Sequence, residues 1–362
     1  MNYVDEFVKE GLVENILKKI RSSAIRDIKI MEVCGTHTMA IMKYGIKDLL
    51  PQNIKLISGP GCPVCVTSQG YIDTAIELSY EDNIIIATFG DMMKVPGTNS
   101  SLKIEKALGR DIRVVYSPIQ SLEIAKQNPE KEIVFLGIGF ETTAPIIALS
   151  IYKAKNENIN NYFVLNSIKT MPNIIQKLIV NKNVNIDGFI LPGHVASIIG
   201  HKPFCFIGKE YNIPAVITGF EPLDILYALY QVVRDVKYGK CKVENLYSKV
   251  VEYEGSRKAK EIINKVFIPS DSNWRGLGNI ENTGLKILEG YKEFDAEKNF
   301  KIVIKEQLAQ TQCICGDILK GVKDPLECKM FSKICSPSNP LGPCMVSLEG
   351  ACAVYYKYGL RR

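Results

Sequence analysis

Short apolar runs recur along the first two thirds of the chain, each ending in Gly, Pro or Asp and leading into a helical stretch. Their β-branched composition and their alternation with helices indicate parallel strands with both faces covered. The runs lie at residues 28–33, 54–58, 84–89, 112–116, 133–136, 162–166, 188–191 and 215–218. This pattern predicts an α/β fold with two Rossmann-like parallel-sheet lobes facing a cleft.

The chain has 362 residues, which suggests two or three domains. Apolar residues at helical spacing between positions 4 and 20 predict an N-terminal amphipathic helix. A polar stretch at 153–161 separates the two series of strands, and residues 242–267 and 285–288 resemble helices. The predicted domains are an N-terminal helix that packs on the C-terminal domain (1–27), two lobes (28–155 and 156–238), and a mainly helical or irregular, cysteine-rich domain (239–362).

Six of the eleven cysteines fall in the last fifty residues: Cys313, Cys315, Cys328, Cys335, Cys344 and Cys352. Soft sulfur ligands suit zinc and iron–sulfur clusters, whereas a zinc site favours two C-x2-4-C pairs and this tail has one close pair, C-x-C. Six sulfurs exceed the four that one cluster needs, so two are left that could form a redox pair. Scattered buried thiols or disulfides are the alternatives, and nothing marks the chain as secreted.

Charge and hydropathy exclude several classes of function. The net charge is +6, but basic and acidic residues are interspersed without a basic stripe, which argues against nucleic-acid binding. The N-terminus carries acidic residues in its first turns, and no apolar run reaches membrane-spanning length, so we expect neither a signal peptide nor a membrane partner. The expected location is a reducing cytoplasm.

Ligands of open α/β sheets bind at loops that leave the carboxyl ends of strands. The loop after the first run contains Cys34 and His37, and a helix start beside a histidine favours a thiolate. The alternative is a small buried cysteine with a structural histidine. The next loop contains Cys62 and Cys65 in a C-x-x-C, which favours a redox dithiol over half of a zinc site because no second C-x-x-C exists.

Two further loops add polar groups. Residues 137–145 contain a G-x-G that lacks the third glycine of a dinucleotide fingerprint, so Glu141, Thr142 and Thr143 are better interpreted as the polar wall of a cleft. His194 follows another strand, and beside a reactive cysteine it is a candidate ligand or proton carrier, although a lone histidine is more often structural.

No P-loop, H-E-x-x-H or G-x-S-x-G motif occurs in the chain. The remaining set of loop thiols, an imidazole and a thiol-rich tail suits the handling of a soft transition metal with electrons supplied nearby. The chain therefore lacks the signature motifs of these conventional enzyme classes, and redox handling of a metal is the better expectation.

Motifs along nearly the whole chain resemble those of the hydrogenase maturation family HypD. They are MEVCGTHTMAI (31–41), GPGCPVCVT (59–67), GFETTAP (139–145), LPGHV (191–195) and the cysteine-rich tail. The resemblance implies two lobes, a 4Fe–4S domain, and a scaffold role in assembling the Fe(CN)2(CO) group of NiFe hydrogenases. It also implies the chaperone HypC and the cyanide donor HypE as partners.

The resemblance further implies roles for single residues. Cys34 would bind the iron with support from His194, and Cys62 with Cys65 would relay electrons. Glu141, Thr142, Thr143 and His37 complete the expected catalytic set. Similarity to ferredoxin:thioredoxin reductase-type sites implies that the tail holds both a cluster and a redox pair of cysteines. The implied cluster ligands are Cys313, Cys328, Cys335 and Cys352. The implied redox pair is Cys315 with Cys344.

Two other hypotheses for the function remain open. A cluster-dependent thiol–disulfide oxidoreductase explains the cysteines equally well but leaves Cys34, His37 and His194 without a role. A zinc-stabilised binding protein would need no redox chemistry. Cys205 and Cys241 match no motif, and we expect them to be ordinary buried thiols.

Overall fold

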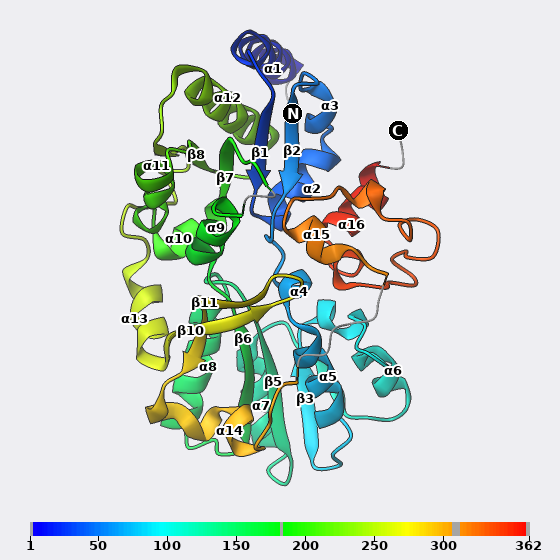
Figure 1. The fold of residues 1–362 in the computed structure, drawn as a ribbon. Coiled ribbons are helices and arrows are strands. Elements are labelled where there is room, and N and C mark those ends of the chain that lie inside the picture. The colour runs from blue at the N-terminus through cyan, green and yellow to red at the C-terminus, as the bar shows by residue number, and fades with distance from the viewer. Residues whose placement is uncertain (1–2, 182–183, 306–311, 360–362) are drawn as a thin grey trace.

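The computed structural model describes residues 3–181, 184–305 and 312–359, and Figure 1 labels its elements. The strands are β1 (Ile28–Glu32), β2 (Ile54–Ser58), β3 (Ile84–Thr88), β4 (Ile112–Val114), β5 (Glu132–Gly139), β6 (Tyr162–Ile168), β7 (Gly188–Pro192), β8 (Ala215–Thr218), β9 (Val243–Asn245), β10 (Phe267–Trp274) and β11 (Gly278–Ile287). All eight predicted runs form strands, and most are largely buried; β4, at the edge of the lower sheet, is the exception, with Val114 exposed.

Helices follow most of the strands and cover the sheets. The α-helices are α1 (Tyr3–Ser23), α2 (Gly35–Lys43), α3 (Ile46–Leu49), α4 (Pro63–Val66), α5 (Gln69–Leu78), α6 (Leu102–Ala107), α7 (Pro118–Gln127), α8 (Ala144–Asn156), α9 (Met171–Ile179), α10 (Gly193–Ile199), α11 (Phe206–Tyr211), α12 (Pro222–Tyr238), α13 (Arg257–Val266), α14 (Ala296–Asn299), α15 (Cys315–Leu319) and α16 (Ala351–Val354). The short helical turns are η1 (Gly90–Lys94), η2 (Lys202–Phe204), η3 (Glu289–Phe294), η4 (Pro325–Glu327), η5 (Pro343–Met345) and η6 (Tyr355–Gly359). No helix within the described ranges combines the length and apolar character needed to cross a bilayer.

Two parallel sheets form the framework of the molecule, one above the other in Figure 1. The upper sheet has the strand order β2-β1-β7-β8-β9, and the lower sheet has the order β4-β3-β5-β6. The chain therefore starts the upper sheet, builds the whole lower sheet, and returns to complete the upper one. The predicted division into lobes at residues 155 and 156 is wrong because β7 pairs with β1 and β6 pairs with β5.

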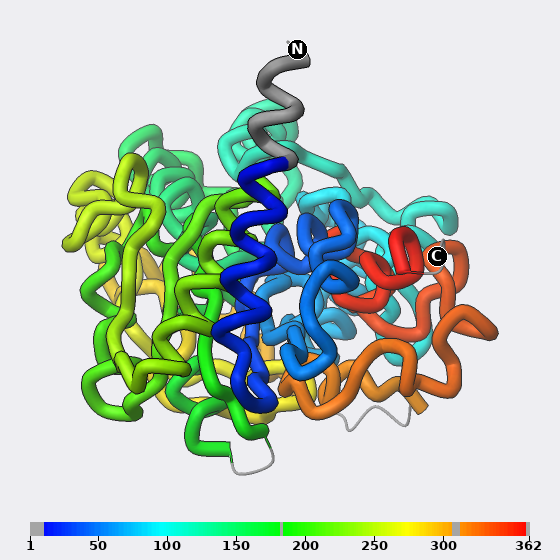
Figure 2. The backbone as a smooth tube through the Cα atoms, turned by 90° about the horizontal axis from the view of Figure 1, so that it is seen from above, coloured from blue at the N-terminus to red at the C-terminus, as the bar shows by residue number. Residues whose placement is uncertain are grey.

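The N-terminal segment forms the predicted helix, α1, but packs elsewhere than expected. Ile16, Leu17 and Ile20 are buried in one cluster with Leu226 and Leu229 of α12. Figure 2 shows α1 in dark blue, with the green elements that include α12 along one side of it. The expectation that it packs on the C-terminal domain is wrong, because its apolar stripe matches the stripe of α12 at the upper sheet.

Residues after Tyr238 also depart from the prediction. The segment expected to be helical over 242–267 contains strand β9 before α13, and residues 267–287 form the antiparallel hairpin of β10 and β11. Trp274 near the hairpin tip is fully buried, and Phe267 and Ile287 pack into the core of the lower sheet. The expected C-terminal domain from residue 239 is therefore too long, since β9 belongs to the upper sheet and the β10–β11 hairpin, a two-stranded sheet of its own, packs on the core of the lower sheet.

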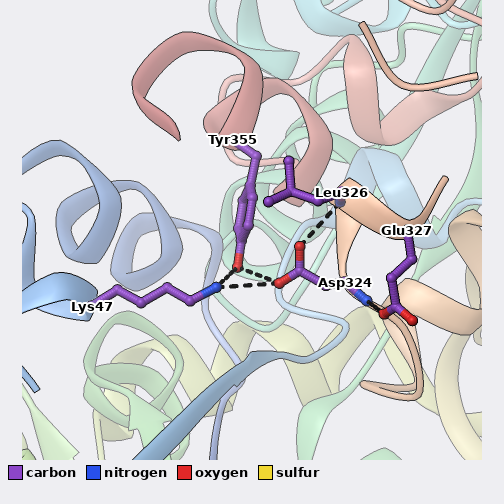
Figure 3. Close-up of polar contacts among 5 residues, drawn as sticks. All are labelled: Lys47, Asp324, Leu326, Glu327 and Tyr355. Atoms are coloured by element: carbon purple, nitrogen blue, oxygen red, sulfur yellow. Dashed lines mark hydrogen bonds and ion pairs between the residues drawn. The ribbon is translucent and has the colours of Figure 1, made fainter. Parts of the chain in front are cut away.

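The cysteine-rich tail, residues 312–359, consists of short helical turns joined by loops and lies at the right of Figure 1 in orange and red. It packs on α2 through α16 and on α4 through η5. Asp324 anchors the tail to α3: its Oδ2 accepts hydrogen bonds from Lys47 Nζ (3.2 Å) and Tyr355 Oη (3.0 Å), as Figure 3 shows. Asp324 Oδ1 also accepts from Leu326 N and so caps η4.

Candidate functional site

One cavity of about 430 Å³ lies where loops of both sheets meet. Cys34 follows β1, Thr142 and Thr143 follow β5, and His194 follows β7; all four side chains line the cavity. Glu349 of the tail closes the same space. The structure thus gathers four of the residues singled out from the sequence in one cleft between the lobes, as expected for the carboxyl ends of parallel strands.

Cys34 is held at the start of α2 by backbone contacts. Its N–H donates to Glu32 Oε2 at 3.1 Å, and Glu32 Oε1 accepts from the Thr38 hydroxyl. Gly61 packs directly against it: a Cβ there would lie 2.4 Å from Cys34 N, so only glycine fits. The Gly61 carbonyl accepts from Gly35 N. The loop after β2 therefore fixes the position of the cysteine that follows β1.

The Cys34 thiol is not the stabilised thiolate that its position suggested. Burial and the nearby Glu349 raise its pKa to about 12, and the N–H groups of His37 and Thr36 at the helix start only partly oppose this. Burial also raises the pKa of Glu32 to about 8. A soft metal ion would have to displace the thiol proton, which is the usual requirement for a cysteine ligand.

Phe220, in the loop after β8, stacks between the two histidines. Its ring centroid lies 3.8 Å from that of His194 and 4.8 Å from that of His37. His37 is fully buried and donates from Nε2 to the Gly219 carbonyl at 2.9 Å, and burial lowers its pKa to about 4. His37 is therefore a neutral group that supports Phe220 from behind, while His194 faces the cavity.

Glu141 turns away from the cavity that its neighbours Thr142 and Thr143 line. It is buried, and its Oε1 accepts from Met171 N at 2.7 Å, which ties the loop after β5 to the start of α9. Its Oε2 has no hydrogen-bond partner among the described residues, and burial raises the pKa of this carboxyl to about 7. The geometry gives Glu141 a positional role behind the cleft wall.

Cys62 and Cys65 form a disulfide with a Cα–Cα distance of 5.3 Å. Both are buried, and Cys62 caps α4 by accepting from Cys65 N. Pro63 between them lines the cavity, whereas Cys65 Sγ lies 3.9 Å from the Pro343 carbonyl oxygen, next to Cys344 of the tail. The pair thus lies between the cleft and the tail.

The six tail cysteines are free thiols that lie close to one another. The Cys315 thiol hydrogen-bonds to Cys313 and Cys344. Burial and the neighbouring Cys313, Cys315, Cys335 and Cys328 raise the pKa of the Cys352 thiol. Cys315 therefore contacts Cys313 as well as Cys344, and all six thiols lie within electrostatic reach of one another.

The tail offers the soft donors that an iron–sulfur cluster uses, because six thiols lie on one short segment and none of them is in a disulfide. No three His, Cys, Asp or Glu side chains in the described parts of the chain are already arranged to hold a metal ion. Binding a cluster therefore requires these thiols to turn toward a common centre and release their protons.

A family model described as "HypD: Hydrogenase formation hypA family" matches residues 11–359. The chain belongs to the HypD family. It is 43% identical to the hydrogenase maturation factor HypD of Azotobacter vinelandii, over 100% of this chain and 98% of that protein. It is 44% identical to a putative hydrogenase expression/formation protein of Methanocaldococcus jannaschii, over 96% and 97% of the two chains, and to the hydrogenase maturation factor HypD2 of Bradyrhizobium diazoefficiens, over 99% and 97%.

The structure adds site residues to the HypD motifs that sequence reasoning missed. Glu32 lies within the first motif, two residues before Cys34, so its position could have suggested a role. Glu349 accepts from Thr36 Oγ1 at 2.8 Å across 313 positions of sequence. Phe220 lies in the loop after β8, which contains none of the recognised HypD motifs. Neither the Glu349 contact nor the stacking of Phe220 has a local sequence signal.

Proposed function

We propose that this member of the HypD family is a scaffold in NiFe hydrogenase maturation, on which an iron carrying cyanide and carbonyl ligands is assembled and from which it is transferred. The observation that carries the proposal is the single cavity that joins Cys34, His194, Thr142 and Thr143. One thiolate, polar donors and an enclosed space are what such a group needs.

The iron is the cargo of this site, and Cys34 is its anchor. An iron that already carries strong-field cyanide and carbonyl ligands needs one or two protein ligands, so Cys34 with one cysteine of the chaperone HypC is sufficient. Cyanide nitrogens accept hydrogen bonds, and the hydroxyls of Thr142 and Thr143 and the ring of His194 supply donors around the cavity. HypE is the proposed source of cyanide.

The tail would hold a 4Fe–4S cluster, which supplies electrons when bound. The proposed ligands are Cys313, Cys328, Cys335 and Cys352, and the proposed redox pair is Cys315 with Cys344. Support comes from the proximity of all six thiols and from the placement of the Cys62–Cys65 disulfide between this tail and the cavity. In this arrangement, Cys62 and Cys65 are placed to exchange electrons by thiol–disulfide exchange.

The same disulfide supports a second candidate, a cluster-dependent thiol–disulfide oxidoreductase. Two measurements on the anaerobically purified chain distinguish the scaffold from the oxidoreductase. Iron and acid-labile sulfide in equal amounts are expected for a cluster, while zinc without sulfide would contradict it. Infrared bands of bound cyanide and carbonyl on the chain isolated with HypC and HypE are expected for the scaffold. A reductase would carry the cluster without those bands.

A further inference from the structure

Arg275, at the tip of the β10–β11 hairpin, reaches across to the C-x-x-C segment. Its backbone N–H donates to Val66 O at 2.9 Å, its Nε donates to Thr67 O at 2.8 Å, and its Nη1 donates to Gln69 Oε1 at 2.8 Å. The two side-chain bonds fix the guanidinium in one orientation, and the backbone bond ties the hairpin tip to the segment that follows Cys65. None of the HypD motifs recognised in the sequence includes this residue.

The hairpin tip also touches the tail. Gly276 has a positive φ of 74°, and a Cβ there would lie 2.3 Å from the Cα of Gly316, so the two backbones are in direct contact. Gly316 follows Cys315, the thiol that contacts both Cys313 and Cys344. Arg275 is therefore placed between the Cys62–Cys65 disulfide and the six tail thiols.

The third guanidinium nitrogen of Arg275 makes no hydrogen bond in the part of the chain that the structure describes. Nη2 is buried and finds no hydrogen-bond acceptor among the described residues. A buried N–H without a partner is costly, and buried polar groups are nearly always satisfied. Because the next residue, Gly276, packs on Gly316 of the tail, this unpaired donor and its positive charge lie beside the segment that carries Cys313 and Cys315.

We propose that Arg275 Nη2 donates a charge-assisted hydrogen bond to the anionic iron–sulfur group held by the tail and thereby raises its reduction potential. The inference rests on the proposed cluster. Reduction adds negative charge to such a cluster, and a fixed positive charge beside it with an unpaired N–H stabilises the reduced form. The same side chain links the tail to the C-x-x-C segment, so one residue connects the two cysteine systems.

The test is the midpoint potential of the cluster in the full-length, anaerobically purified chain, with iron and sulfide measured first for every variant. Arg275→Gln is expected to shift the potential to more negative values. Arg275→Lys, which keeps the charge but loses the fork to Thr67 and Gln69, is expected to stay closer to the wild type. Arg257→Gln, which removes an exposed arginine paired with Glu261 on α13, is the matched control and is expected to change nothing.

An Arg275→Gln chain with full cluster content and the wild-type potential would overturn the proposal. If that variant loses its cluster, Arg275→Lys decides: a folded lysine variant with a near-wild-type potential supports the role of the charge, and a folded lysine variant without a cluster contradicts it. A wild-type chain without iron and sulfide would instead refute the proposed cluster, so the two failures are distinguishable.

Discussion

The cleft and the tail both present cysteines, but they hold them in opposite ways. Cys34 sits at the end of a fully paired parallel strand, with a helix starting beside it and Gly61 packed on its backbone. The tail thiols sit on short turns, where Cys328 and Cys335 flank a loop with little regular structure. The hydrogen bonds of a sheet fix the position of a single thiol at a strand end. Thiols on short turns lack that support, so a bound group would fix their positions.

The neighbours that affect the pKa of the cysteines also differ between the cleft and the tail. The pKa of Cys34 is raised by burial and by the carboxyls of Glu349 and Glu32, which are fixed parts of the fold. The pKa of Cys352 is raised first by burial and then by neighbouring thiols of the tail, which are Cys313, Cys315, Cys335 and Cys328. We infer that the cleft is preformed and that the tail would take its final arrangement only with the proposed cluster.

Replacing a tail cysteine should produce the largest effect. Cys328→Ala is expected to abolish the broad iron–sulfur absorption and to speed limited proteolysis of the tail at least about tenfold, since tenfold is about 1.4 kcal/mol and metal–ligand bonds contribute more. Cys241→Ala, a half-buried thiol outside every motif, is the control. Retention of a full cluster in Cys328→Ala would show that the ligand set is different.

The preformed cleft should show a pH dependence that the tail does not share. Glu141 has a folded-state pKa of about 7 against an ordinary value of 4.5, because it is buried. Its carboxyl is neutral in both states below pH 4.5, so stability is fully present there and falls as pH rises through 7. Glu141→Gln keeps an acceptor for Met171 N and should raise the thermal midpoint by about 2–4 °C at pH 8, corresponding to roughly 1 kcal/mol.

The pH series of thermal unfolding provides its own control for this variant. At pH 4 the wild type and Glu141→Gln should unfold at the same temperature, and the two curves should separate on going to pH 8. Parallel curves across that range would show that the carboxyl is already satisfied in the folded protein.

A smaller effect is expected where the tail is anchored to α3. Asp324→Ala removes the acceptor for Lys47 and Tyr355 and the cap of η4, which should cost about 1–2 kcal/mol in urea unfolding. Lys323→Ala breaks only an exposed ion pair with Asp317 and should cost less than about 0.5 kcal/mol. Equal effects would mean that the Asp324 network does not anchor the tail.

The parts of the fold that could be predicted are those with local signals. The apolar runs became strands β1 to β8 because buried parallel strands carry their hydrophobic pattern within five or six residues. Strand partners carry no such signal, so the pairing of β7 with β1 was missed. The hairpin was missed because its strands are largely polar and its buried Trp274 contacts residues far away in sequence.

The candidate site divides along the same line. Cys34, Thr142, Thr143 and His194 could be found because each follows a strand, and strand ends of parallel sheets converge. Which side chain of a loop faces the cavity depends on packing, so Glu141 and His37 were expected there and lie behind it. Arg275 could not be found, since its side chain binds the Thr67 carbonyl and the Gln69 side chain, which lie 208 and 206 residues away in the sequence.

The most direct test of the account is the infrared spectrum of the Cys34→Ala chain isolated with HypC and HypE, beside the wild type and Cys205→Ala. The wild type and Cys205→Ala should show bands of bound cyanide and carbonyl. Cys34→Ala should lack those bands while keeping the iron–sulfur absorption of the tail. Cyanide and carbonyl bands that persist on purified Cys34→Ala would contradict the assignment of Cys34 as the iron anchor.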